Sequence, residues 1–186
     1  MKARYPFALA YQLSESLAGF AKRVAKQNEH LRADGLPPST VAFHRVTGDT
    51  VRESFDELRD GELKGPTGIR LSMAPYVVGE NAAAGKPLPT LSQLEMLAAA
   101  ASPSKVPRGQ VRELLRLLRE NLEGAGKHYE RFVKQAAPQD KPKREAFADA
   151  LDTLLGTTGH QCHDAGATPL HDAWTLLSFN SHEDEP

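Results

Sequence analysis

Apolar residues near the start of the chain recur every three or four positions, which is the spacing of an amphipathic helix. They are Phe7, Ala10, Leu13, Leu17, Phe20, Ala21 and Val24. Pro6 lies just before this series, where its missing N–H would have no intrahelical partner. Lys22, Arg23 and Lys26 follow in the last two turns, where cations interact favourably with the helix dipole. The pattern predicts a helix over residues 7–27 with a basic end.

The next part of the chain alternates turn residues with short strand-like runs. Residues 32–38 are rich in Gly, Pro and Asp and predict a loop. Residues 40–46 are rich in β-branched and aromatic side chains and predict a strand, and residues 51–58 predict a short helix. Residues 69–78 predict a second extended run. Within it, Pro75 has no N–H to donate to a ladder and so belongs at an edge or a bend.

After residue 79 the periodicity becomes helical. Residues 80–89 are rich in Ala, Gly and Pro and predict a linker. Helical spacing then recurs over residues 91–97, 111–132 (with a break near Gly124–Gly126), 147–155 and 174–179. The pattern predicts an α+β chain in three parts: an α/β segment over residues 1–79, the linker, and a small helical bundle over residues 90–186.

Composition narrows the classes of function. The 186 residues contain 23 Lys and Arg against 24 Asp and Glu, a balance that argues against a general polyanion binder but allows a local basic patch. Aromatic residues make up only 6%, which argues against an aromatic stacking platform for single strands. The single cysteine excludes an internal disulfide. No apolar run approaches the roughly 20 residues that cross a bilayer. We expect a cytoplasmic protein without a membrane contact.

The order of short motifs carries a resemblance to a known family. The helix Pro6–Leu17 (PFALAYQLSESL) continues into Ala21-Lys22-Arg23, and Val41–Gly48 (VAFHRVTG) follows. Leu58–Leu63 (LRDGEL), Ala74-Pro75-Tyr76 and an all-helical tail complete the series. This series resembles the C-terminal part of the second palm domain in the large subunit of type III CRISPR effector complexes. It is also similar to related GGDEF-like palm polymerases of prokaryotic antiviral systems. The motifs cover residues 4–78, and element order extends the likeness to about residue 180.

The resemblance implies a partial palm, ferredoxin-like and GGDEF-like, followed by a helical domain. Complete members of the family hold divalent metals on a Gly-Gly-Asp-Asp hairpin and make cyclic oligoadenylate from ATP. This sequence has no such string, because Asp34-Gly35 and Asp60-Gly61 lack both a preceding glycine and a second carboxylate. We therefore expect no catalytic residue, metal or cofactor in this chain, with ATP and a divalent metal implied only for a complete palm. The implied partners are other subunits of a ribonucleoprotein effector complex or a split palm half.

One functional role can remain without the hairpin. In GGDEF-type palms, the lysine of an Ala-Lys pair in the corresponding helix reaches phosphates of the bound nucleotide. The matching residue here is Lys22, with Arg23 and Lys26 beside it. The resemblance therefore implies that these three cations bind a nucleotide. The alternative is a solvated basic helix end without a ligand.

Two further groups of residues are weaker candidates. His160, Cys162, His163 and His171, with Asp164 and Asp172 nearby, are ligand types that bind zinc. Their spacing does not match a zinc finger, and a polar loop between helices is the alternative. A locally basic stretch offers a contact surface for RNA or a protein partner, or simply a solvated face: Lys127, Arg131, Lys134, Lys141, Lys143 and Arg144.

Three functions stay open. The first is a non-catalytic segment of a CRISPR-type palm polymerase, which contributes nucleotide-phosphate contacts and assembly surface. The second is a free-standing interaction module in which the palm remnant is a scaffold. The third is an unrelated regulatory or metal-binding domain. A palm helix without its neighbouring strands should leave an open sheet edge and exposed apolar surface, so we expect the chain to need a partner.

Overall fold

The computed structural model describes residues 7–28, 36–46, 54–79, 88–159 and 161–180. The chain divides into two units, which are described one at a time. The sheet unit comprises Met1–Leu63 and Ala74–Leu91, and the helical unit comprises Lys64–Met73 and Ser92–Pro186. Within the described ranges there are seven helices and one two-stranded antiparallel sheet. The fold class is therefore α+β and mostly helical.

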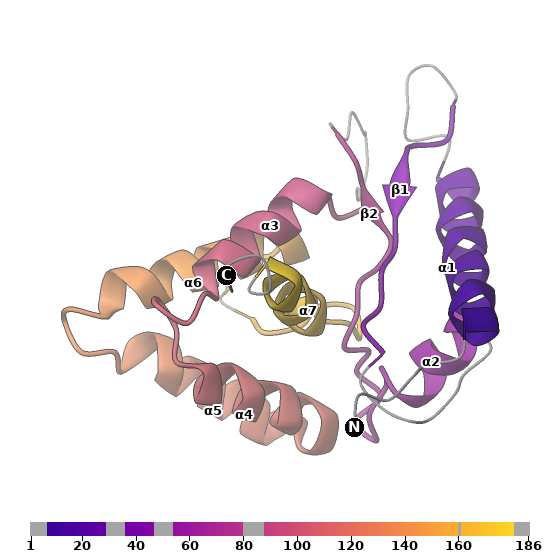
Figure 1. Ribbon diagram of the computed structural model, residues 1–186. Helices are drawn as coiled ribbons and strands as arrows, with labels where there is room; N and C mark the ends of the chain where they lie inside the picture. Colours follow the sequence, from indigo (N-terminus) through magenta and orange to yellow (C-terminus); the bar gives the residue numbers. More distant parts are fainter. Residues whose placement is uncertain (1–6, 29–35, 47–53, 80–87, 160, 181–186) are drawn as a thin grey trace, which may run out of the picture. The chain divides into compact units, whose positions relative to one another are not determined.

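The sheet unit is built on the predicted first helix. Helix α1 spans Phe7–Gln27, which confirms the amphipathic pattern. One face of α1 packs against helix α2, Phe55–Gly61, and Figure 1 shows the two helices side by side. The rings of Phe20 and Phe55 meet with their centroids 5.0 Å apart. The buried core of this unit consists of Leu13, Phe20, Phe55, Leu58 and Leu63.

Helix α2 begins later than the sequence pattern predicts. Its N-cap is Ser54, whose hydroxyl accepts a hydrogen bond from the backbone N–H of Glu57 at 3.2 Å. The backbone N–H of Phe55 donates to the hydroxyl of Ser16 at 2.8 Å, which ties the start of α2 to α1. Residues 51–53, where the predicted helix begins, lie outside the described residues.

The sheet is much shorter than predicted. Strand β1, Thr40–Val41, pairs antiparallel with strand β2, Tyr76–Val77, in the register Thr40↔Val77 and Val41↔Tyr76. The predicted strand over residues 40–46 is therefore wrong beyond Val41. The next pair in this register would place Ala42 opposite Pro75. The ladder stops where the proline begins.

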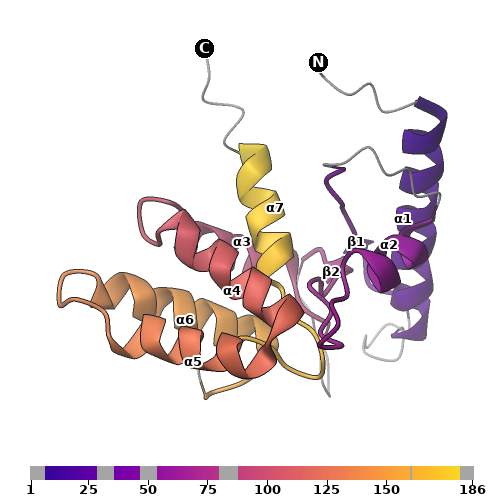
Figure 2. The ribbon, with the colours of Figure 1, turned by 90° about the horizontal axis from the view of Figure 1, so that it is seen from below.

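The described residues of the helical unit form five helices, and one break between helices differs from the prediction. They are α3, Leu91–Ala100; α4, Arg108–Glu120; α5, Leu122–Lys134; α6, Lys141–Leu155; and α7, Leu170–Asn180. Figure 2 shows α5 and α6 alongside each other. The predicted break near Gly124–Gly126 lies instead at Asn121, because the Asn121 side chain accepts a hydrogen bond from the N–H of Gly124 and caps α5. Gly124 itself is inside the helix.

Aromatic rings hold α5 and α6 together. The ring of Phe147 on α6 lies edge-on to Tyr129 and Phe132 of α5, with centroid distances of 6.4 and 5.7 Å. Edge-to-face rings at this separation attract each other in addition to the area they bury. Phe147 and Tyr129 are almost fully buried, as are Leu118 and Leu151. These contacts form the centre of the helical unit.

The segment Lys64–Met73 belongs to the helical unit, although the sequence pattern places it within residues 1–79. The backbone of Arg70 explains the difference. Its N–H donates to the carbonyl of Gly166, and its own carbonyl accepts from the N–H of Thr168, both at 2.9 Å. These contacts bridge about a hundred residues of sequence and leave no local pattern. Residues 80–87 of the expected linker lie outside the described residues, so the linker stays a prediction.

Asp172 of α7 fixes the end of this segment, and its removal should destabilise the helical unit. The buried carboxylate accepts hydrogen bonds from the hydroxyl of Ser72 and the N–H of Met73, both at 2.9 Å. We expect Asp172→Ala to lower the free energy of unfolding by about 2–4 kcal/mol, because two donors lose their charged acceptor. Urea unfolding measures the change. The exposed Asp149→Ala is the matched control and should cost less than about 0.5 kcal/mol. Equal costs for the two variants would contradict this role.

Candidate functional site

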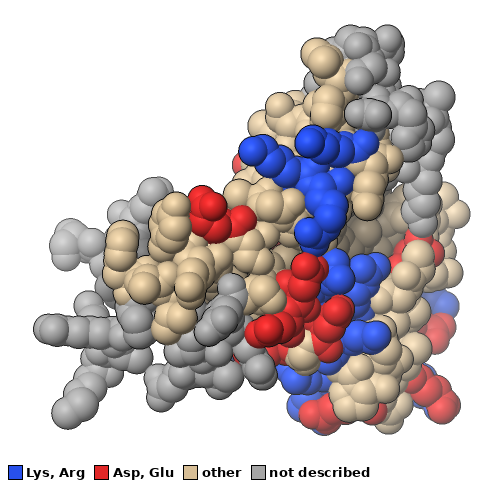
Figure 3. Space-filling view, turned by 90° about the vertical axis from the view of Figure 1, so that its right-hand side faces the viewer, with Lys and Arg blue, Asp and Glu red and all other residues tan. Residues whose placement is uncertain are grey.

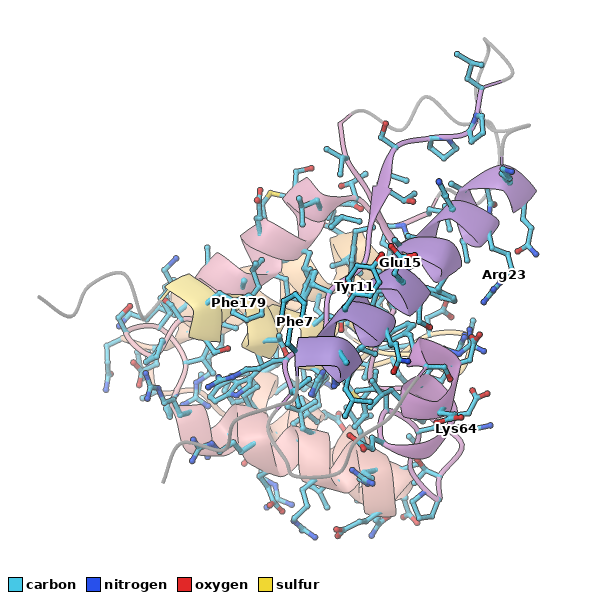
Figure 4. All side chains as sticks on the ribbon, turned by 45° about the vertical axis from the view of Figure 1, so that its right-hand side comes forward. Phe7, Tyr11, Glu15, Arg23, Lys64 and Phe179 are labelled. Atoms are coloured by element: carbon cyan, nitrogen blue, oxygen red, sulfur yellow. The ribbon has the colours of Figure 1, made fainter. Side chains whose placement is uncertain are left out.

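The three predicted phosphate-binding cations do not share one environment. Arg23 is turned toward α2, where its guanidinium donates to the carboxylate of Asp56 at 3.0 Å. It also lies 5.8 Å from the centroid of the Phe20 ring. Figure 4 shows Arg23 pointing away from the side of α1 that carries Tyr11 and Glu15. Arg23 therefore already has a counter-charge.

Lys22 and Lys26 instead line a groove between α1 and the segment over residues 37–42. The groove has a volume of about 660 Å³ and is open to solvent. Within the described part of the chain, neither ammonium group has an acidic partner. The other residues that line the groove are mostly small or apolar: Ser14, Leu17, Ala18, Ala21, Ala25, Pro37, Pro38, Ser39, Thr40, Val41 and Ala42.

The sequence explains why these two lysines act together. Residues four apart lie on the same side of an α-helix, so Lys22 and Lys26 project in one direction. Arg23 is turned by about 100° from Lys22 but by only about 60° from Lys26 around the helix axis. Its contact with Asp56, rather than helical spacing alone, therefore distinguishes it from the lysines. The three alanines on the groove side keep the helix surface low, so that a ligand can approach the backbone. The basic end of α1 thus contains one cation in an exposed ion pair and two cations with no acidic partner among the described residues.

Electrostatics favour an anion beside the two lysines. Figure 3 faces the side of the molecule that carries α1 and shows groups of basic side chains with a group of acidic side chains between them. The C-terminal end of a helix carries partial negative charge and does not attract anions by itself. Attraction of a phosphate would therefore depend on the two ammonium groups. Each has three N–H donors, which suits an oxygen-rich ligand.

A second cavity lies in the helical unit beside α5. It has a volume of about 370 Å³, and its lining includes Tyr129, Glu130, Lys134, Cys162 and His163. The hydroxyl of Tyr129 is buried and has no hydrogen-bond partner among the described residues. Burial raises the pKa of Tyr129, and the negative charge of Asp152 raises it further. The sequence pattern gives no sign of this role for Tyr129, because a tyrosine in a helical apolar stripe is indistinguishable from an ordinary core residue.

The expected histidine–cysteine cluster is only partly described. Among the residues that the structure describes, no group of three or more His, Cys, Asp or Glu side chains could hold a metal ion. His160, one of the predicted ligands, lies outside them. Asp172, near the cluster in sequence, is engaged by Ser72 and Met73. Zinc binding by His160, Cys162, His163 and His171 therefore stays a hypothesis.

Much of the basic stretch between residues 127 and 144 is paired along its own helices. Lys127 binds Glu123, Lys134 binds Glu130 at 2.6 Å, and Lys141 binds Glu145 at 3.7 Å. The guanidinium of Arg144 donates to the carbonyl of Phe132 and lies over its ring, 4.6 Å from the centroid. Each pair lowers the charge that an RNA backbone would meet. The groove beside α1 is accordingly the stronger candidate for an anion.

Comparison of the chain with protein-family models, with curated proteins and with solved structures finds no match. Among the helices in the described ranges, none has both the length and the apolar character that spanning a membrane requires. The candidate site therefore depends on its own geometry and on the motif resemblance.

The environment of Cys162 predicts an unreactive thiol. Burial raises its pKa from an ordinary value of 9.0 to about 11, because the thiolate is poorly solvated there. At pH 8 the thiolate fraction should fall about 100-fold below that of the unfolded chain. We expect iodoacetamide to alkylate the folded protein at least about 100-fold more slowly than the urea-unfolded protein, with a rate that still rises above pH 9. Similar rates in the two states would contradict the buried placement.

Proposed function

We propose that this chain is a non-catalytic palm segment of a type III CRISPR-like antiviral complex, in which it contacts nucleotide phosphates and contributes assembly surface. The observation that supports the phosphate role is the pairing pattern at the end of α1. Lys22 and Lys26 line the groove without an acidic partner in the described part, whereas Arg23 is neutralised by Asp56. The motif order supports the palm assignment.

The chemistry required of the groove is charge neutralisation. ATP brings several negative charges close together on its triphosphate, and two ammonium groups on one side of a helix can each donate to phosphate oxygens. The open groove leaves room for the base and sugar. The proposal assigns no bond-making step to this chain, because the sequence has no Gly-Gly-Asp-Asp string. Any nucleotidyl transfer would require the carboxylates of a complete palm.

A second candidate is a small-molecule-binding regulatory module. Its supporting observation is the buried hydroxyl of Tyr129, which lines a cavity of about 370 Å³ and has no partner among the described residues. Such a hydroxyl can donate to a neutral ligand oxygen or nitrogen. A screen of small neutral compounds by thermal shift tests this candidate, which predicts a hit whose stabilising effect is lost in Tyr129→Phe and kept in Lys22→Ala.

The phosphate role predicts a specific set of affinities. Calorimetric titration of ATP should show saturable binding that weakens as salt rises. Lys22→Ala and Lys26→Ala should each weaken binding about 10- to 100-fold, because each removes a charge-assisted hydrogen bond. Arg23→Ala is the matched control on the same helix, and we expect a change below about threefold because its charge is already engaged by Asp56.

Failure of ATP to bind saturably to the chain, together with no effect of Lys22→Ala in a complex that supplies the missing palm strands, would reject the phosphate role. Far-ultraviolet circular dichroism of each variant separates lost binding from lost folding. Equal losses in Lys22→Ala and Arg23→Ala would instead indicate an unspecific effect of net charge.

A further inference from the structure

Strand β1 has one paired edge and one open edge. The N–H of Val78 donates to the carbonyl of Ser39 at 2.8 Å, so Ser39 faces β2. In an antiparallel pair, successive residues direct their backbone groups to opposite edges, so the N–H and carbonyl of Thr40 face away from β2. Val77, opposite Thr40, likewise uses its N–H on its own outer side, toward Pro89 at 2.9 Å. Neither backbone group of Thr40 has a partner in the described residues.

The groove beside α1 lies at this open edge. Figures 1 and 2 both show β1 between β2 and α1. The side chain of Thr40 reaches α1, because its hydroxyl donates to the carbonyl of Ala21 at 3.1 Å. The same residue therefore lines the groove and presents free backbone groups. Only a backbone that is extended alongside β1 can satisfy both groups in a ladder.

Two large aromatic side chains are exposed on the N-terminal half of α1, outside the lining of the groove. Phe7 is 86% exposed and Tyr11 58% exposed, one turn apart on the side opposite Leu13 and Phe20. Figure 4 shows Phe7, Tyr11 and Glu15 following one another along the helix. The same stripe continues through Ala18 to Lys22 by helical spacing. Two large exposed aromatic side chains close together are the kind of apolar patch that marks an interaction site.

We propose that the groove takes an extended strand of a partner polypeptide, which pairs with the open edge at Thr40. The partner strand would place apolar side chains against Leu17 and Ala18, and acidic side chains near Lys22 and Lys26. A partner carboxylate and a phosphate would compete for these two ammonium groups, so the peptide and ATP are expected to displace each other. The inference rests on the proposed function only in that the chain works within a larger assembly.

The charges argue against a second copy of this chain as the occupant. The carbonyl of Ala21 accepts a hydrogen bond from the hydroxyl of Thr40, so the adjacent Lys22 lies close to the open edge of β1. A two-fold axis through that edge would bring Lys22 and Lys26 of both copies together. Like charges directly across an interface are unfavourable. A helix is also a poor occupant, because its backbone groups are already paired within itself. An extended strand with acidic side chains can pair with the backbone groups of Thr40 and also neutralise Lys22 and Lys26.

The test selects a displayed library of random linear peptides, about ten residues long, on the full chain. Strand addition predicts selected peptides that alternate apolar and polar residues with a period of two and that carry acidic residues at one end. The best synthetic peptide should slow hydrogen exchange of the Thr40 amide. Thr40→Pro removes the outward N–H without touching the β1–β2 ladder, and it should weaken peptide binding about tenfold. Thr40→Val, which loses only the hydroxyl, should change the affinity by less than about threefold.

Three results would overturn the proposal: no enriched peptide, peptides with helical spacing, or equal binding by Thr40→Pro and the unaltered chain. Analytical ultracentrifugation tests whether a second copy of the chain occupies the groove. A dimer that is lost in Thr40→Pro would assign the groove to that second copy and overturn the proposal. Circular dichroism establishes that each variant folds. Peptide binding that survives while ATP binding fails would reject only the phosphate role, and the reverse outcome would reject only the strand.

Discussion

The contact between Phe20 and Phe55 determines which side chains of α1 face the core and which face the groove or solvent. Their rings lie 5.0 Å apart in a core that α1 shares with α2, and this contact fixes the rotation of α1 about its own axis. With that face buried, Arg23 is held beside Asp56. Lys22 and Lys26 are turned to the groove, and Phe7 and Tyr11 to solvent. The packing of Phe20 on Phe55 therefore places Lys22 and Lys26 at the groove and leaves Phe7 and Tyr11 exposed.

Features that depend on local periodicity were predicted correctly. Helix α1 begins and ends where the three- and four-residue spacing places it, because an amphipathic stripe needs no distant information. The strand over residues 40–46 was predicted too long, because its pairing ends opposite Pro75, which lies far away in sequence. The break before α5 was misplaced because a side-chain cap at Asn121, and not a glycine, sets it.

The sequence names the cations at the end of α1 but not their surroundings. The sequence groups Lys22, Arg23 and Lys26, yet it cannot show that Asp56, 33 residues after Arg23, neutralises only one of them. The hydrogen bonds of Asp172 to Ser72 and Met73 are equally invisible, since they join residues about a hundred positions apart. Long-range pairs of this kind decide which charged groups remain available, and they follow from packing alone.

We propose that the groove between α1 and β1 is where this chain binds its ligands. Chemical-shift mapping of the ¹⁵N-labelled protein during an ATP titration tests this most directly. We expect saturable shifts that cluster at residues 14–26 and 37–42. These shifts should be lost in Lys22→Ala and kept in Arg23→Ala. Shifts that cluster around Tyr129 and His163 instead, or that are the same in both variants, would contradict it.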